Sequence, residues 1–236
     1  MSDDFELEPG LTFGEWLRAE VTRELHVEKR GFFADRVARV SRRLQAGRPR
    51  TEQFEVLIPW SPVATAFTAP GKYIYFNRRL LERCPTDEVV AFVIGHEIAH
   101  HDLGHLRRLP TEVARWASAS GITSLAVALL RGIQHRLTSP ARECAADRAA
   151  LDLCLRAGYN ATKALRVFRV MRGVALDRGD IDGVYGPDEH SDRELHPDAT
   201  LATKARIWLW MKRRGYLPID DRHAEAKRYL DSLAVA

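Results

Sequence analysis

Cysteine is scarce in this chain. Cys84, Cys144 and Cys154 are an odd number and have no regular spacing. Small secreted domains use an even set of cysteines as a disulfide framework, so the count argues for free thiols and a reducing compartment. Residues 1–6 are acidic and contain no apolar run, so no signal peptide is predicted. We therefore expect a cytoplasmic protein.

Long apolar runs are also missing. The longest uncharged stretch, Trp116 to Leu130, contains Ser, Thr and Gly. A membrane-spanning helix needs about 20 mostly apolar residues. The sequence therefore predicts no transmembrane segment, and it leaves a peripheral membrane contact through Trp116–Leu130 open.

Glycine and proline are too few for a disordered or fibrous chain, at 15 and 11 of 236 residues. The 45% of hydrophobic residues suit a globular protein, and no break in composition divides it, so one domain over residues 1–236 is expected. A block of one charge is absent too. The 36 Lys+Arg are scattered and give a net charge of only +4, which predicts a solvated basic surface and no nucleic-acid partner.

Apolar periodicity predicts a mainly helical chain with a small sheet. Strands are expected at 54–59 and 73–76, and the Pro70-Gly71 turn between them indicates a hairpin or a small meander. A central, buried helix is expected from Thr86 to about Gly104, because its residues are apolar on most sides. Further helices are predicted at Phe13–Leu25, Phe32–Leu44, Trp116–Ile133, Ala141–Gly158, Asn160–Leu176, Thr200–Arg214 and Asp221–Leu233, with a long loop at residues 177–197.

The chemistry is concentrated in His96-Glu97-Ile98-Ala99-His100, on the predicted central helix. Residues four apart share one helical face, so both imidazoles can reach one zinc ion. Glu97 lies beside the metal position, where it can take a proton from water and pass it to a leaving amine. Two histidines and a glutamate on a buried helix are unfavourable unless something compensates for them, which favours a zinc site.

A catalytic zinc needs a third protein ligand and an open position for water. Glu143 and Asp147 share a face of a later helix, beside small alanines that permit close packing. We expect Glu143 to bind the metal and Asp147 to accept the N–H of a ligand imidazole. Cys144 points about 100° away from Glu143 on a helix and is expected to be a packed residue.

Two other histidines, His101 and His105, are also four apart, but neither is followed by a glutamate that can act as a base. They are interpreted as a polar shoulder at the helix end. The metzincin pattern needs a glycine and a third histidine at the eighth and eleventh positions. Gly104 and His105 are ninth and tenth, so that class is rejected.

A set of motifs in one order extends over much of the chain. It comprises Thr65-Ala66-Phe67, Pro70-Gly71-Lys72-Tyr73-Ile74, Leu80-Leu81, Asp87 to His100, His105, Glu143-Cys144-Ala145-Ala146-Asp147 and Ala157-Gly158-Tyr159. With these motifs, residues 30–210 resemble the HtpX and CAAX-prenyl-protease type of gluzincin zinc metallopeptidase. The resemblance implies an α+β, mainly α fold, with a gluzincin core and a small β-sheet packed on the motif helix. It divides the domain into N-terminal helices (1–50), a catalytic core (51–215) and a C-terminal helix (216–236).

The resemblance also implies roles for individual residues. His96, His100 and Glu143 would hold one zinc ion, and Glu97 would be the general base. A peptide substrate would add as a strand along the sheet edge at Thr65, Ala66 and Phe67. Two departures stand out: the family usually has Asn at the position of Thr65, and the Arg that follows its His-Pro pair comes several residues later here, at Arg206.

By the same resemblance His196 would stabilise the oxyanion, helped by Arg206 or by Tyr185, with His190 as a competing loop histidine. Residues 177–197 would form a lid. The expected function is that of a zinc-dependent metalloendopeptidase. The alternative is a catalytically weakened zinc-binding module that acts through protein or membrane-surface interaction.

Overall fold

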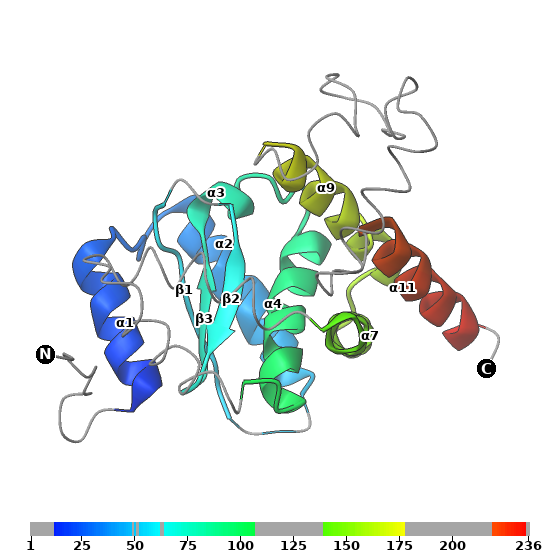
Figure 1. The fold of residues 1–236 in the computed structure, drawn as a ribbon, viewed down its shortest axis with the longest axis horizontal. Coiled ribbons are helices and arrows are strands. Elements are labelled where there is room, and N and C mark those ends of the chain that lie inside the picture. The colour runs from blue at the N-terminus through cyan, green and yellow to red at the C-terminus, as the bar shows by residue number, and fades with distance from the viewer. Residues whose placement is uncertain are drawn as a thin grey trace, which may run out of the picture.

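The computed structural model describes residues 12–48, 50, 52–61, 64–106, 139–177 and 219–234. This part is mainly helical with one small sheet, as predicted (Figure 1). The predicted helices Trp116–Ile133 and Thr200–Arg214, and the predicted loop beyond Asp177, lie outside the described residues. Within the described residues, no helix is both long and apolar enough to cross a membrane.

The two predicted N-terminal helices are present as α1 (Phe13–Glu24) and α2 (Phe32–Ala46). A capping box starts α1: the Glu15 N–H donates to Thr12 Oγ1 at 3.3 Å, and the Thr12 N–H donates to the Glu15 carboxylate at 2.9 Å. The apolar side of α1 packs on one face of the sheet, and α2 lies on the other side with the remaining helices (Figure 1).

The sheet has three strands, β1 (Glu55–Leu57), β2 (Ala66–Ala69) and β3 (Tyr73–Phe76), in the order β1-β3-β2. The predicted turn at Pro70-Gly71 joins β2 and β3 in an antiparallel hairpin, with positive φ at Gly71 and Lys72, although β2 itself was not predicted as a strand. The two predicted strands, 54–59 and 73–76, were expected to form a hairpin or a meander, and this is wrong, because β1 pairs with β3 in parallel. After β1 the chain pairs with the N-terminal region through a Val27–Pro59 bridge, and it then returns to the far side of β3.

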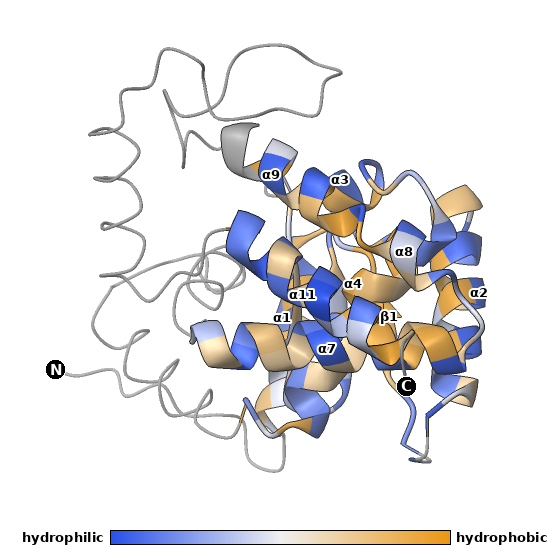
Figure 2. Ribbon diagram, turned by 90° about the vertical axis from the view of Figure 1, so that its right-hand side faces the viewer, coloured by the Kyte–Doolittle hydropathy of each residue, from blue (hydrophilic) through white to orange (hydrophobic). Residues whose placement is uncertain are grey.

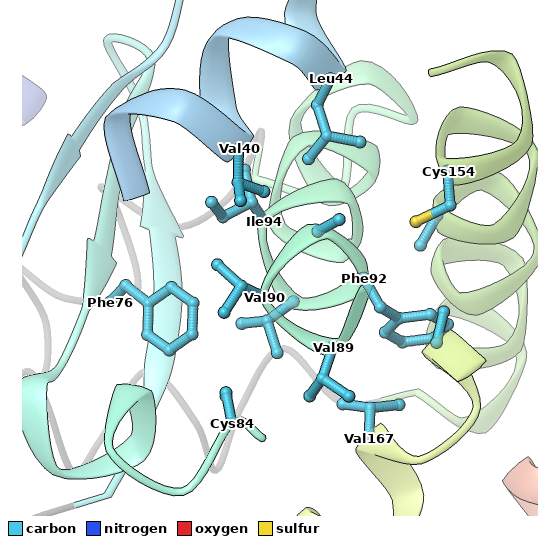
Figure 3. Packing of buried hydrophobic residues seen from close by; sticks show 14 of the residues in the cluster. Val40, Leu44, Phe76, Cys84, Val89, Val90, Phe92, Ile94, Cys154 and Val167 are labelled. Carbon is cyan, nitrogen blue, oxygen red and sulfur yellow. The ribbon is translucent and has the colours of Figure 1, made fainter. Parts of the chain in front are cut away.

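The helix α4 (Asp87–Asp102) lies between the sheet and the helix α7, and it also packs against α2 (Figure 1). It begins after Thr86, as predicted, although the Thr86 side chain makes no capping hydrogen bond. Its apolar residues point in several directions into the core, as Figure 3 shows for Val89, Val90, Phe92 and Ile94. A helix buried on nearly all sides holds the groups on it in fixed positions.

The helices that follow are α7 (Pro140–Arg156), α8 (Ala161–Ala164), α9 (Val167–Asp177) and α11 (Ile219–Leu233). One helix was predicted from Asn160 to Leu176, but the chain makes two, because a turn at Leu165 and Arg166 interrupts it. This turn allows Leu165 and Phe168 both to be buried in the main core. The short helix α3 (Arg78–Leu81) links the sheet to α4.

Candidate metal centre

His96 and His100 project from the same side of α4, one turn apart. Their Nε2 atoms lie 2.9 Å from each other, and both side chains are largely buried. The rings meet at 77°, so both nitrogen atoms point to a common region between the rings. The predicted pair of imidazoles on one helical face is therefore present.

Glu143 comes to this pair from α7. Its Oε1 atom lies 3.3 Å from His100 Nε2, and its Oε2 atom lies 3.6 Å from His96 Nε2. The helices α7 and α4 pack closely here, and Gly95 on α4 faces the fully buried Ala150 on α7. One donor atom from each of His96, His100 and Glu143 lies within 4.8 Å of the other two, so this group can hold a metal ion.

The far sides of both imidazoles also have partners. His96 Nδ1 lies 3.0 Å from Asp147 Oδ1, the contact predicted for this acid. His100 Nδ1 lies 2.9 Å from His105 Nδ1. The interpretation of His105 as part of a polar helix shoulder is therefore wrong, whereas His101 packs edge-on against Phe54.

The end of α4 brings His105 to His100. Gly104, with φ 71°, turns the chain back, and the His105 N–H then donates to the His100 carbonyl at 2.9 Å while the Gly104 N–H donates to the His101 carbonyl. These two bonds form a Schellman motif, which ends the helix where it was predicted to end. The motif places two residues that are five apart in sequence side by side.

The donor set fits a bound cation. When an acceptor takes the Nδ1–H of each imidazole, the Nε2 atom carries a lone pair. Two such lone pairs facing each other at 2.9 Å repel unless a proton or a cation lies between them. Two imidazoles and one carboxylate are also a typical donor set of catalytic zinc sites.

The charges around His96, His100 and Glu143 favour a positive charge between these three residues. Burial by itself lowers the pKa of His96, but the neighbouring Asp147 and Glu143 carboxylates raise it to about 10. Burial by itself raises the pKa of Glu143, yet His100, His96 and Arg222 hold it well below its usual range. Burial and the adjacent His100 lower the pKa of His105 to about 4, which keeps its ring neutral and able to accept a hydrogen bond.

Glu97 follows His96 on α4 and is buried at 8% exposure. Burial raises its pKa, while the positive charge of the two imidazoles and a hydrogen bond from the Thr68 backbone lower it. The edge strand β2 therefore touches this carboxylate directly. Because its pKa is raised and it lies beside the donor set, Glu97 is suited to accept and donate protons there.

The three residues expected to hold a peptide backbone lie at the start of the edge strand. The Asn77 N–H donates to the Thr65 carbonyl, so the next residue, Ala66, turns its own N–H and carbonyl away from β3. The Thr65 hydroxyl donates to the Ala66 carbonyl at 3.3 Å. Phe67 is stacked on Tyr75 and buried under α1.

Arg222 also belongs to this centre, and the sequence did not predict it. Its Nε and Nη2 atoms donate to the two oxygens of Asp147 at 2.9 and 2.7 Å, and its Nη1 atom lies 2.9 Å from Glu143 Oε2. Asp147 and Glu143 raise its pKa further, against the effect of burial. No motif surrounds Arg222, so only the docking of α11 reveals its role. The other predicted residues, His196, Arg206, Tyr185 and His190, lie outside the described residues.

Two histidines on one helix and a glutamate on a second helix, with their donor atoms close together, are typical of a metal-binding protein. The sequence model of Peptidase family M48 matches residues 33–203, which include all three donors. The chain belongs to this family, and membership implies a metallopeptidase that acts on peptides or proteins. No curated protein matched the chain.

Proposed function

We propose that the chain is a zinc-dependent metalloendopeptidase in which His96, His100 and Glu143 hold one zinc ion. The observation that carries this proposal is the facing pair of Nε2 atoms at 2.9 Å, with the opposite nitrogens 3.0 Å from Asp147 Oδ1 and 2.9 Å from His105 Nδ1. Such ring orientation is typical of imidazoles that bind a metal. Within the family, we assign the chain to the HtpX and CAAX-prenyl-protease type with a gluzincin core, on the order of its motifs.

Zinc bound here would supply Lewis-acid polarisation and a water molecule with a pKa of about 7. Glu97 would act as the proton acceptor and then as the proton donor to the leaving amine, because it follows His96 on α4 and burial raises its pKa. Its contact with the Thr68 backbone fixes the carboxylate against β2. The base therefore stays in one place relative to the strand beside it.

The peptide substrate adds to the open edge of β2 as a further strand. The order β1-β3-β2 leaves β2 at the edge of the described sheet, and Ala66 directs its backbone groups away from β3. An extended peptide can pair with such groups. Because the Thr65 hydroxyl is bonded to the Ala66 carbonyl, the main chain of this segment, more than the Thr65 side chain, would hold the substrate.

The oxyanion would be stabilised by His196, with Arg206 or Tyr185 as further donors, and residues 177–197 would close over the substrate. These assignments rest on the motif resemblance and on the position of His196 before Pro197. We further propose that residues 1–236 form one domain. The packing of α1 on the sheet and of α11 on α7 supports that proposal, since both ends of the described chain contact the central elements.

The test combines metal analysis with cleavage of casein or of a fluorogenic peptide. Wild-type protein should contain one zinc per chain and cleave the peptide, and a chelator should abolish cleavage. Glu97→Gln should keep its zinc and lose activity by several orders of magnitude, while Glu88→Gln, on the first turn of the same helix, should remain active. Equal, chelator-insensitive cleavage by wild type and Glu97→Gln would refute the proposed function.

A further inference from the structure

The helix α11 docks onto α7 through a row of polar pairs. Arg222 pairs with Asp147, Arg148 pairs with Glu225, and the Tyr229 hydroxyl donates to Asp152 at 2.7 Å. Of its residues, Ala226 is fully buried in the contact, and much of the helix is hydrophilic (Figure 2). The helix lies beyond residues 33–203, which match the family.

Only the first of these pairs reaches the metal centre. The guanidinium of Arg222 is buried, and three of its nitrogens contact two carboxylates one helical turn apart, on Asp147 and Glu143. The two bonds to Asp147 form the parallel, bidentate arrangement that a guanidinium makes and an ammonium does not. Arg222 therefore fixes the rotation of the Asp147 carboxylate and the position of Glu143 together.

This contact selects which oxygen of Glu143 is left for a metal. Oε2 accepts from Arg222 at 2.9 Å, so the other oxygen, Oε1, is the one free of Arg222, and it lies 3.3 Å from His100 Nε2. The same guanidinium holds Asp147, whose Oδ1 faces Nδ1 of His96. Arg222 thus holds both Glu143, a proposed ligand, and Asp147, which lies against the proposed ligand His96.

We propose that Arg222 is a positioning residue of the zinc centre, supplied by the C-terminal helix α11. It holds Glu143 so that this residue binds zinc through Oε1 alone, and it holds Asp147 against His96. One-oxygen binding leaves a coordination position open for water, which a catalytic zinc requires. This proposal rests on the zinc site proposed above. It assigns α11 to the active centre, although that helix carries no motif of the family.

The test measures the metal itself in Arg222→Met and Arg222→Lys. Zinc affinity is obtained by competition with a chromogenic chelator, and the visible absorption of bound Co²⁺ reports the coordination number, since four-coordinate Co²⁺ absorbs more strongly than higher-coordinate Co²⁺. Removing groups that orient metal ligands typically lowers affinity by about 10- to 100-fold. We expect Arg222→Met to show a loss of that size and weaker Co²⁺ absorption, as Glu143 becomes free to bind through both oxygens. Arg222→Lys, which keeps the charge but not the bidentate contact, should show the altered Co²⁺ spectrum as well.

Matched controls come from the same helix contact. Tyr229→Phe and Arg148→Met remove the other two polar pairs between α7 and α11 without touching Glu143 or Asp147. These variants should keep the wild-type zinc affinity and Co²⁺ spectrum even where they lower the melting temperature. If both Arg222 variants keep the wild-type affinity and spectrum, or if the controls change them equally, Arg222 only attaches α11 and the proposal is wrong.

The outcomes separate this proposal from the proposed function. Zinc binding by a wild type that cleaves no peptide would refute the peptidase assignment, while the affinities and spectra would still decide the role of Arg222. A wild type that binds no zinc would refute both. Should Arg222→Met not fold, Arg222→Lys decides, because it retains a charge next to the two buried carboxylates.

Discussion

The Nδ1 atoms of His100 and His105 lie 2.9 Å apart, although the two residues belong to different parts of a helix end. His105 follows the glycine that stops α4, and its backbone N–H also binds the His100 carbonyl. Side-chain and main-chain contacts thus join the same two residues. This arrangement makes His105 the group that orients His100, as Asp147 orients His96.

Replacement of His105 by alanine should weaken zinc binding. The variant leaves His100 Nδ1 without its acceptor, and loss of such a partner typically lowers metal affinity by about 10- to 100-fold. Chelator competition measures the change. His101→Ala is the control, because His101 packs on Phe54 at the same helix end and faces away from the donors. Equal zinc affinity of the two variants would contradict the role given to His105.

Asp147→Asn should reduce both zinc affinity and stability. The amide cannot balance the buried guanidinium of Arg222, and breaking a buried ion pair by removing one partner costs about 3–5 kcal/mol. Urea unfolding of the metal-free protein measures this loss. Asp152→Asn, which weakens only the hydrogen bond from Tyr229, should cost far less. A loss for Asp147→Asn no larger than that of the control would show that Arg222 does not depend on Asp147.

Two glycines should respond oppositely to replacement by alanine. A Cβ on Gly14 would lie 1.7 Å from the Pro70 carbonyl oxygen, so Gly14→Ala forces α1 away from the hairpin turn and should destabilise the protein by about 1–3 kcal/mol or more. A Cβ on Gly95 would meet Ala150 at an ordinary 3.5–3.6 Å. Gly95→Ala should therefore be neutral or stabilise the protein by up to about 1 kcal/mol, because alanine favours helix. Thermal unfolding of both variants checks the contrast, and equal destabilisation would refute it.

Stability should fall in acid partly through Asp87. Burial by itself raises the pKa of this carboxyl, but Arg36 and Arg39 bind it and bring the net pKa below the usual 3.8. A carboxyl with a lowered pKa in the folded state stabilises the protein above its unfolded-state pKa, and this contribution disappears as the pH falls through the folded-state pKa. Asp87→Asn should therefore destabilise the protein at pH 7, and this penalty should shrink as the pH falls through the folded-state pKa of Asp87 toward pH 2. Glu88→Gln in the same turn is the control for the charge at the helix start.

The unfolding measurement for Asp87→Asn is made at both pH values in urea. An Asp87→Asn penalty that stays constant from neutral to acid pH would mean that the ion pairs with Arg36 and Arg39 do not lower the pKa of Asp87. A penalty shared equally by Glu88→Gln would point to the helix dipole instead.

Several features of the structure were predictable from local sequence. The start of α4 at Thr86, its end near Gly104, and the cap and proline before α7 are short-range signals, and each helix lies where they indicate. The positions of the two histidines four apart, and of two acids four apart, follow from helical geometry alone. The turn at Pro70-Gly71 was likewise predictable from a short-range sequence signal.

Other features depended on contacts between distant segments. The pairing of β1 with β3 in parallel was not predicted, and the break between α8 and α9 was missed because both halves carry a continuous helical pattern. The role of His105 was not predicted, because the turn at Gly104 that follows the helix brings His105 back to His100. In each case the burial of particular side chains, which local periodicity does not report, selected the conformation.

The sequence by itself determined the metal-binding helix, because the spacing of His96, Glu97 and His100 and the apolar residues around them leave one face for the chemistry. It also indicated Glu143 and Asp147 as partners. Only the tertiary structure decided how these groups are held, with His105 brought back by a turn and Arg222 supplied by α11 from 75 residues beyond Asp147. The physical reason is that a ligand's identity is a local property, whereas its orientation depends on which helices pack against it.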